Sequence, residues 1–99
     1  MRLTDPTDFQ ILDELADGKR NNAANLSFEL GKDRSYINTR LPVLADYDLL
    51  ERVGPSPNSG LYEITDRGLA VLDIKAAATG SEIDFDARLD ERTTATAEP

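Results

Sequence analysis

The sequence contains no cysteine and no histidine. Without cysteine the chain can form neither a disulfide bond nor a thiolate metal site, and without histidine it lacks the usual general base and the commonest transition-metal ligand. Carboxylate pairs do occur, as in Asp13-Glu14 and Asp90-Glu91, but no nucleophile, glycine-rich phosphate loop or metal-ligand cluster accompanies them. The composition therefore argues against redox chemistry, a zinc site and an enzyme, and we expect no cofactor.

Long apolar runs are also missing, and no basic segment followed by an apolar stretch opens the chain. A membrane-spanning helix needs about 20 predominantly apolar residues, and a secretory signal needs both N-terminal features. We therefore expect a cytoplasmic protein without a membrane span. A chain of 99 residues makes one small domain. Because the last stretch is acidic and rich in Thr and Ala, we expect the domain over 1–78 and a largely flexible acidic tail over 79–99.

Two short helices joined by a turn that contains Gly31 are expected in the first half of the chain. The first is expected over 23–31 with Asn22 as its N-cap and Asn21 as the alternative cap, and the second over about 33–46. Two short helices that meet at a glycine-containing turn are typical of a helix-turn-helix.

The helix expected over 33–46 has an aliphatic face and a polar face. An advance of about 100° per residue brings Ile37, Leu41 and Leu44 onto one side. The side chains that point away from this side or flank it can hydrogen-bond: Ser35, Tyr36, Asn38 and Thr39. We expect the aliphatic face to pack in the core, which leaves the polar face for solvent or a partner.

Two prolines fall within or beside expected helices. Pro6 suits the first position of a scaffold helix, with Asp5 as its N-cap. Pro42 lies inside the helix over 33–46, where it removes one hydrogen bond and clashes with the preceding turn. We expect a kink after Arg40, and the alternative is that the helix breaks there.

A β-hairpin is expected directly after this helix. The pattern predicts a strand over 48–53, a turn-rich loop over 54–60 and a returning strand over 61–64. A hairpin in this position is a wing. The expected fold is α+β and mainly helical: a winged helix-turn-helix with a three-helix core, a two-stranded wing and an additional C-terminal helix.

Three segments carry a resemblance to a known family: 33–36 (Asp-Arg-Ser-Tyr), 44–55 (Leu-Ala-Asp-Tyr-Asp-Leu-Leu-Glu-Arg-Val-Gly-Pro) and 61–68 (Leu-Tyr-Glu-Ile-Thr-Asp-Arg-Gly). They resemble the winged-helix proteins of halophilic archaea that are related to the phiH-type phage repressor. The likeness covers about Thr7 to Lys75. It implies a DNA-binding transcriptional regulator, without indicating whether it represses or activates.

The additional helix is expected over about 66–78, with Thr65 as its N-cap. Its apolar residues form two strips: Leu69, Leu72 and Ala76 on one face, and Ala70, Val71, Ile74 and Ala77 on another. The core needs one face, so the excess predicts a homodimer through this helix, and a two-fold dimer matches a palindromic operator. The alternative is that both strips pack inside one subunit.

The net charge of −8 is the strongest argument against nucleic acid, because a DNA-binding domain is expected to be basic. Arginine outnumbers lysine, and acids, Ala and Thr are plentiful, as in proteins of a high-salt cytoplasm. In molar salt the Debye length falls to about 3 Å, which screens long-range repulsion. The charge is also uneven: 18–40 holds five basic and two acidic residues (5 − 2 = +3), whereas two basic and six acidic residues follow Ala78 (2 − 6 = −4).

The expected partner is double-stranded DNA, held by three parts of the chain. The linker before 23–31 is expected to contact phosphates, the helix over 33–46 to read bases in the major groove, and the wing to contact the backbone or minor groove. The candidate residues are Lys19, Arg20, Asn22, Lys32, Arg34, Ser35, Tyr36, Asn38, Thr39, Arg40, Asn58 and Ser59. Asn38 suits an adenine edge, and Arg34 or Arg40 a guanine or a phosphate.

A solvated surface also explains polar residues on an exposed helix, and a neutral wing loop is compatible with a plain connector. The main alternative function is a protein-interaction module: a winged helix without DNA affinity that binds another protein through Phe28, the last helix or the tail. Such a module has no need of the excess of basic residues over 18–40, the basic island of the chain. We therefore predict a sequence-specific, repressor-like DNA-binding regulator.

Overall fold

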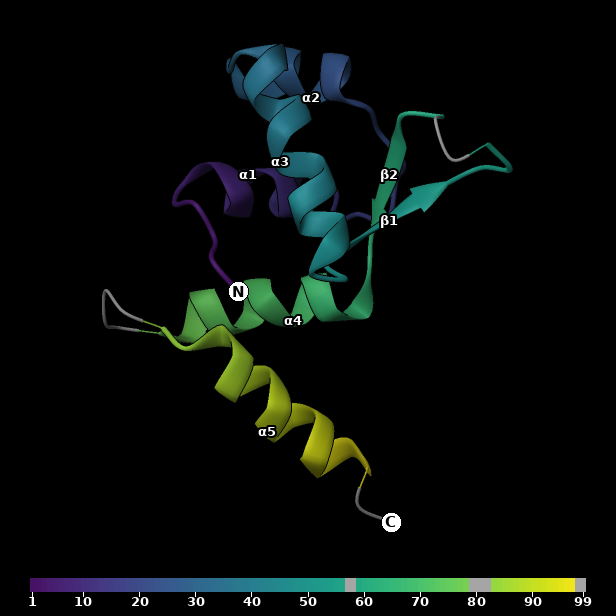
Figure 1. Cartoon of the computed structure of the whole chain (residues 1–99). Helices are drawn as coiled ribbons and strands as arrows, with labels where there is room; N and C mark the ends of the chain where they lie inside the picture. The colour runs from purple at the N-terminus through teal and green to yellow at the C-terminus, as the bar shows by residue number, and fades with distance from the viewer. Residues whose placement is uncertain (57–58, 79–82, 98–99) are drawn as a thin grey trace.

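The computed structural model describes residues 1–56, 59–78 and 83–97, with side chains throughout except in 92–97. The elements are α1 (Thr7–Glu14), α2 (Ala23–Leu30), α3 (Arg34–Asp46), β1 (Leu50–Val53), β2 (Leu61–Ile64), α4 (Asp66–Ala77) and α5 (Phe85–Ala97). In this described part, five helices and one two-stranded antiparallel sheet make a small α+β fold, compatible with a winged-helix arrangement. Figure 1 shows α3 running from α2 to α4, with α1 on one side and the hairpin on the other.

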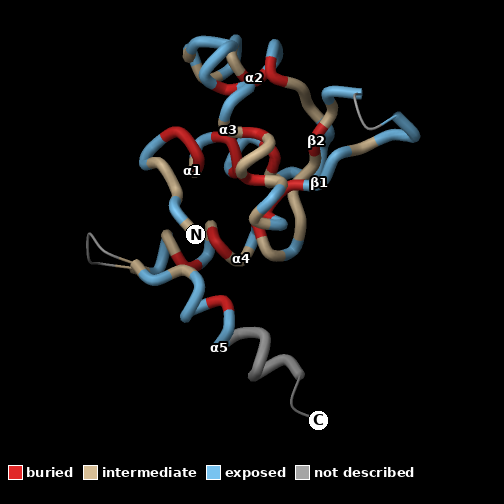
Figure 2. Tube along the Cα trace, in the orientation of Figure 1, coloured by how far each residue is buried: buried red, intermediate tan, exposed pale blue. Residues whose placement is uncertain are grey.

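The hydrophobic core gathers where α1, α3, α4 and the start of β1 face one another (Figure 2). The apolar side chains that are at most 1% exposed are Ile11, Leu12, Leu15, Leu26, Ile37, Leu41, Leu44, Leu49, Leu50 and Val71. Full burial of one such side chain contributes about 1.5–3 kcal/mol. The aliphatic face predicted for α3 is confirmed, because Ile37, Leu41 and Leu44 all lie in this core.

Side-chain caps fix the ends of α2 and α4 where the sequence predicted them. The side-chain oxygen of Asn22 accepts a hydrogen bond from the backbone N–H of Asn25 at 2.9 Å, and α2 ends at Gly31, whose φ is +65°. At α4 the hydroxyl of Thr65 accepts from the N–H of Gly68 at 3.1 Å. Each cap satisfies a backbone donor that has no partner inside its helix.

The start of α1 differs from the prediction. The helix begins at Thr7 rather than Pro6, and Asp5 does not cap it: the Asp5 carboxylate lies 3.1 Å from the ammonium of Lys75. Asp8 organises this turn instead. Its N–H donates to the carbonyl of Thr4 at 2.9 Å, and its carboxylate accepts from the N–H of Thr4 at 2.7 Å.

Helix α3 passes through Pro42 without a break, so the alternative of a broken helix is wrong. Pro42 has no N–H, which leaves the carbonyl of Asn38 without its usual partner four residues on. Buried Leu41 and Leu44 on either side hold this weaker turn against the core. The kink expected after Arg40 stays a prediction.

The hairpin begins at Leu50, two residues later than predicted, because Asp48 turns the chain with a φ of +66°. In its register Leu50 pairs with Ile64 and Val53 with Leu61. Asn21, in the linker before α2, joins the sheet through an isolated bridge to Tyr62, with N–H to O distances of 2.9 and 2.8 Å.

Helix α5 lies where the sequence predicted an acidic tail. The ring of Phe85 is 5.6 Å from that of Phe9, and Leu89 is only 3% exposed, so the first half of α5 packs onto the domain. Residues of the expected tail therefore contribute to the core, which the acidic composition did not predict. Residues 79–82 and 98–99 of the expected tail lie outside the described residues, and the division at residue 78 stays a prediction.

Candidate nucleic-acid interface

The turn between α2 and α3 is held by Ser27 from two sides. Its carbonyl accepts the N–H of Lys32 at 3.1 Å, and its hydroxyl donates to the carbonyl of Lys32. Gly31 supplies the left-handed backbone conformation that the turn needs, which a residue with a Cβ adopts at a cost. Helices α2 and α3 also pack on each other.

The polar face of the first half of α3 is open to solvent, as predicted. The exposed residues are Arg34, Ser35, Tyr36, Asn38 and Thr39, whereas Ile37 between them is fully buried. The hydroxyl of Thr39 donates to the carbonyl of Tyr36 at 2.6 Å. Within the described chain, the side chains of Arg34, Ser35 and Asn38 make no hydrogen bond or ion pair, so their donors and acceptors are available to a ligand.

Arg40 does not belong to this open face, and its assignment as a DNA contact is corrected. Its Nε and one terminal nitrogen donate to the two carboxylate oxygens of Asp8, at 2.9 and 2.8 Å. The Asp8 side chain is fully buried and that of Arg40 is 18% exposed. These hydrogen bonds raise the pKa of Arg40 above its ordinary value. The two donors that Arg40 gives to this buried carboxylate are not available to a base or a phosphate.

The basic linker lies beside the wing. The Asn21–Tyr62 bridge ties the linker to β2, and Arg20 lies 3.6 Å from the carboxylate of Glu63. The ammonium of Lys19 is 3.9 Å from Asp17. Both ion pairs are solvent-exposed, and such pairs are worth little, so either cation can transfer to a phosphate at small cost. Unlike these cations, the Asn22 side-chain oxygen is occupied by its cap.

Of the two candidates in the hairpin loop, the structure describes one. Asn58 lies outside the described residues. Ser59 spends its hydroxyl on the wing itself, because it donates to the carbonyl of Val53 and accepts from the N–H of Leu61 at 3.4 Å. Arg52, which the sequence offers as a further cation beside this loop, is exposed on β1 with its guanidinium carbon 5.8 Å from the centre of the Tyr62 ring.

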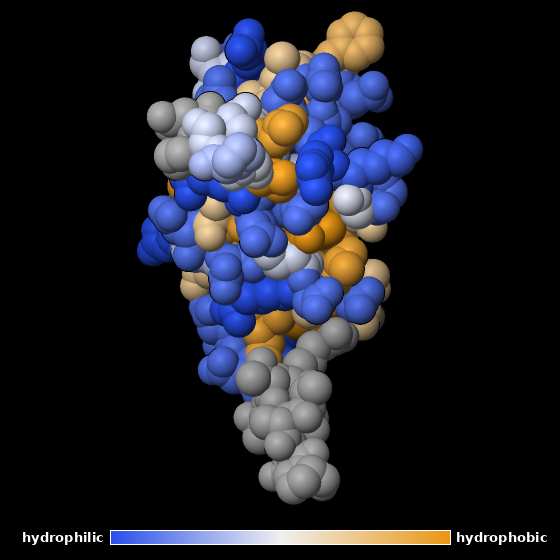
Figure 3. Space-filling view, turned by 90° about the vertical axis from the view of Figure 1, so that its right-hand side faces the viewer, coloured by the Kyte–Doolittle hydropathy of each residue, from blue (hydrophilic) through white to orange (hydrophobic). Residues whose placement is uncertain are grey.

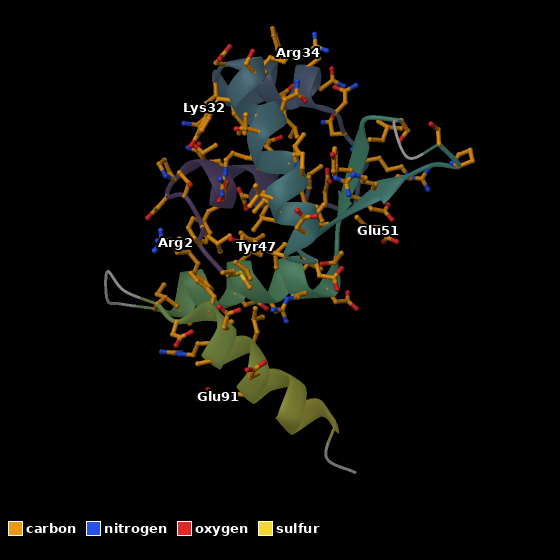
Figure 4. The ribbon with its side chains drawn as sticks, viewed as in Figure 1. Arg2, Lys32, Arg34, Tyr47, Glu51 and Glu91 are labelled. Atoms are coloured by element: carbon orange, nitrogen blue, oxygen red, sulfur yellow. The ribbon has the colours of Figure 1, made fainter. Side chains whose placement is uncertain are left out.

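Two of the remaining candidate cations, Lys32 and Arg34, lie at one end of the molecule. Figure 4 shows Lys32 and Arg34 at the end where α2 meets α3, and Glu91 on α5 at the opposite end. With Arg40 neutralised by Asp8, segment 18–40 keeps four basic and two acidic residues, a charge of 4 − 2 = +2. The chain is acidic as a whole, but segment 18–40 keeps a small positive charge.

Helix α4 uses most of its apolar residues inside one subunit. Val71 and Ile74, from the second strip, are at most 3% exposed, and Leu72, from the first, packs against the core. Leu69 is 38% exposed and is the main apolar residue of α4 left at the surface. The alternative in which both strips pack internally therefore accounts for most of the excess.

Exposed apolar residues elsewhere are scattered. Phe28 on α2 is 85% exposed, the highest value among the large hydrophobic residues described. On the face in Figure 3 hydrophobic areas are separated by hydrophilic side chains and do not merge into one broad patch. Single exposed apolar residues are common on soluble domains.

No helix of the described chain is long and apolar enough to cross a membrane. Comparisons with protein-family models, with curated proteins and with solved structures found no match to this chain. The resemblance to the phiH-type family stays a prediction, and function has to be inferred from the interface itself.

Two residues that shape this interface were not predicted from the sequence. Asp8 lies four residues before Leu12 and seven before Leu15, on the inward stripe of α1, which is a detectable sign of a buried carboxylate. Tyr62 gives no comparable sign, because its link to Asn21 exists only once the hairpin has folded beside α2.

Proposed function

We propose that this chain is a winged helix-turn-helix protein that binds double-stranded DNA in a sequence-specific manner and regulates transcription, with the first half of α3 in the major groove. The observation that supports it best is the open polar face of α3. Arg34, Ser35 and Asn38 are exposed there with unused hydrogen-bonding groups, on a helix whose opposite face is buried. Base edges in the major groove are read by such side chains near a helix N-terminus.

The surroundings of α3 fit the same proposal. The Asn21–Tyr62 bridge holds the linker with Lys19 and Arg20 against the wing, beside the reading helix. Cations in this position neutralise phosphates and set the register of a protein on the duplex. The overall acidity fits a cytoplasm with molar salt, where long-range repulsion is screened.

The test is selection of binding sites from a library of random duplex DNA at high KCl. The native protein is expected to enrich one motif, and an Arg34→Ala, Asn38→Ala double variant is expected to lose it. Arg40 is left intact, because its removal would disturb folding and binding together. Arg88→Ala is the matched control, since it removes an exposed arginine from α5, away from the interface.

If the double variant enriched the same motif, the residues that recognise the bases would have to lie outside α3. Failure of the native protein to enrich any sequence across a range of KCl concentrations would reject the DNA proposal. The protein-interaction module then becomes the function to pursue, and the 85% exposure of Phe28 marks where its partner would be sought.

We further propose that the chain acts as a homodimer through α4, over about 66–78. Leu69 and the neighbouring exposed Ala76 and Ala77 are the apolar surface left for it. A Leu69→Asp substitution is expected to convert a dimer to a monomer, because it places a charge in an apolar contact. Light scattering after gel filtration measures this, with Gln10→Asp on exposed α1 as a control of equal charge. A native protein of monomer mass would reject the dimer.

A further inference from the structure

The buried pair of Asp8 and Arg40 joins two helices that otherwise have few direct connections. Helix α3 packs mainly on α2 and β1, and α1 packs mainly on α2 and α4. In the described chain, the hydrogen bonds of Arg40 to Asp8 are the side-chain hydrogen bonds that run directly between α1 and α3. Asp8 is itself fixed, because its carboxylate also accepts the N–H of Thr4.

The first half of α3, residues 34–40, is the reading half in the proposed function, and one apolar side chain attaches it to the core. Between residues 34 and 40 Ile37 alone is buried, and the residues around it are exposed. One buried side chain holds a helix at a point but leaves it able to tilt and rotate about that point. Arg40 follows Ile37 by three residues, or about 60° around the helix axis, so its side chain supplies a second anchor on a different line.

The position of Arg40 along α3 increases the importance of this second anchor. The next turn contains Pro42. Because proline has no N–H, the carbonyl of Asn38 receives no helical hydrogen bond from it. The C-terminal half of α3 is held by Leu41 and Leu44 in the core. The N-terminal half, which lies beyond the weakened turn, relies on Ile37, on α2 and on the pair with Asp8.

We propose that Asp8 and Arg40 are positioning residues that set the orientation of the reading half of α3 relative to α1, and that DNA affinity depends on this orientation. The inference rests on the proposed function. Neither residue touches DNA: the guanidinium is directed to the protein interior, where a planar fork on a carboxylate fixes both distance and angle. In this proposal Arg34 and Asn38 contact the DNA, and Arg40 orients the part of α3 that carries them.

The test uses a variant of the full chain that removes both charges together, Asp8→Asn with Arg40→Met. No isolated charge is then left in the interior, the amide oxygen can still accept from Thr4, and methionine fills the space of the arginine stem. An Asp5→Asn, Lys75→Met variant is the control: it removes an ion pair of the same charges between the start of α1 and α4. Cooperative thermal unfolding is checked first for both.

Two measurements are made on each folded variant. DNA affinity of the Asp8, Arg40 variant is expected to fall about tenfold or more, as when one or two well-formed base contacts are removed. Residual dipolar couplings of 34–40 are expected to change relative to those of α1, while those of α4 stay as in the native protein. The control variant is expected to change neither quantity. Arg40→Lys, which keeps the charge but loses the fork, is expected to fall between native protein and double variant in both.

Unchanged couplings over 34–40 would overturn the inference, whatever happens to affinity, and so would native affinity in a variant whose couplings have changed. If the native protein binds no DNA at any salt concentration, the proposed function fails and the link to affinity with it. The couplings then still decide whether the pair orients α3, so the two failures are distinguishable.

Discussion

At the scale of single residues, two arginines of α3 show how environment divides similar side chains. Arg34 and Arg40 both belong to the basic island of the sequence, yet Arg34 is exposed whereas Arg40 is paired with Asp8 in the interior. The partner of Arg40 lies 32 residues earlier in the chain. A pairing over that separation exists only after α1 and α3 have come together, so residue type alone assigned both arginines to DNA.

We expect Arg40→Ala to lower the free energy of unfolding by about 3–5 kcal/mol, because it leaves the Asp8 carboxylate buried without its countercharge. Arg34→Ala is expected to change it by less than about 0.5 kcal/mol, as for an exposed residue. Denaturant unfolding followed by circular dichroism at fixed KCl measures both. The raised pKa of Arg40 means that its guanidinium stays charged well beyond neutral pH and that its contribution is lost only as pH rises through the arginine range, so the effect is expected to be constant around neutrality. Equal effects of the two substitutions would contradict the assignment of Arg40 to the interior.

Gly68 illustrates a steric requirement at the same scale. A Cβ on Gly68 would lie 2.4 Å from the carbonyl oxygen of Leu49 and 2.6 Å from Cγ1 of Ile64. The first turn of α4 thus packs directly on the open end of the hairpin, where the chain enters it at Leu49 and leaves it at Ile64.

We expect Gly68→Ala to destabilise the fold by about 1–3 kcal/mol despite the better helix propensity of alanine, because backbone has to move. Ala76→Gly in the exposed part of α4 is the comparison and is expected to cost about 1 kcal/mol through propensity alone. Thermal or chemical unfolding compares them. A stabilised Gly68→Ala variant would show that the contact is looser than the structure indicates.

At the scale of elements, local signals predicted most of the helix ends. Asn22, Gly31 and Thr65 lie at the predicted termini because a cap depends on a few neighbouring residues and on backbone donors within the same turn. Pro42 was harder to assign, because the intrinsic cost of proline in a helix competes with burial of the leucines around it. Burial of these leucines in the core outweighs the cost of the proline, and the helix continues through Pro42.

Helix α5 was not predicted, although its signals are present in the sequence. The carboxylate of Asp84 accepts from the N–H of Ala87 at 3.1 Å, and Phe85 and Leu89 are four residues apart on one face. The segment is acidic and rich in Thr and Ala, and this composition predicts a flexible tail more strongly than two apolar residues predict a helix.

We expect Leu89→Ala to lower the free energy of unfolding by about 2–3 kcal/mol, since it empties a buried site between α5 and α4. Arg88→Ala, an exposed neighbour on the same helix, is expected to have little effect. Both can be followed by chemical unfolding of the full chain. If neither substitution matters, the segment behaves as the flexible tail that composition predicted.

At the scale of the whole molecule, basic and acidic residues are unevenly distributed along the chain: segment 18–40 holds five basic and two acidic residues, whereas two basic and six acidic residues follow Ala78. Lys32 and Arg34 lie at the end where α2 meets α3, and Glu91 on α5 lies at the opposite end (Figure 4). Such a distribution turns the less acidic end toward a polyanion during approach, and the effect weakens with rising salt.

The proposed phosphate contacts can be tested through this dependence on salt. Replacing Lys19 and Arg20 by alanine is expected to lower the slope of log affinity against log KCl by about 1.8, or 0.9 for each phosphate that is no longer neutralised, and to weaken all sequences alike. Asn38→Ala is expected to keep the slope and relax the preference at one base position. Titrations of operator and mutated duplexes over a KCl series measure both quantities. An unchanged slope would remove the linker from the interface.

The sequence alone determined what depends on neighbours in the chain: the capped ends of α2 and α4, the buried and exposed sides of α3, and the hairpin that follows it. Periodicity and turn chemistry act within a few residues, so they can be read without a structure. Only the tertiary structure decided that Arg40 faces Asp8, that Asn21 joins the wing, and that α5 covers part of α4. Each of these is a contact between segments distant in sequence, and its energy comes from burial or charge pairing that exists only in the assembled fold.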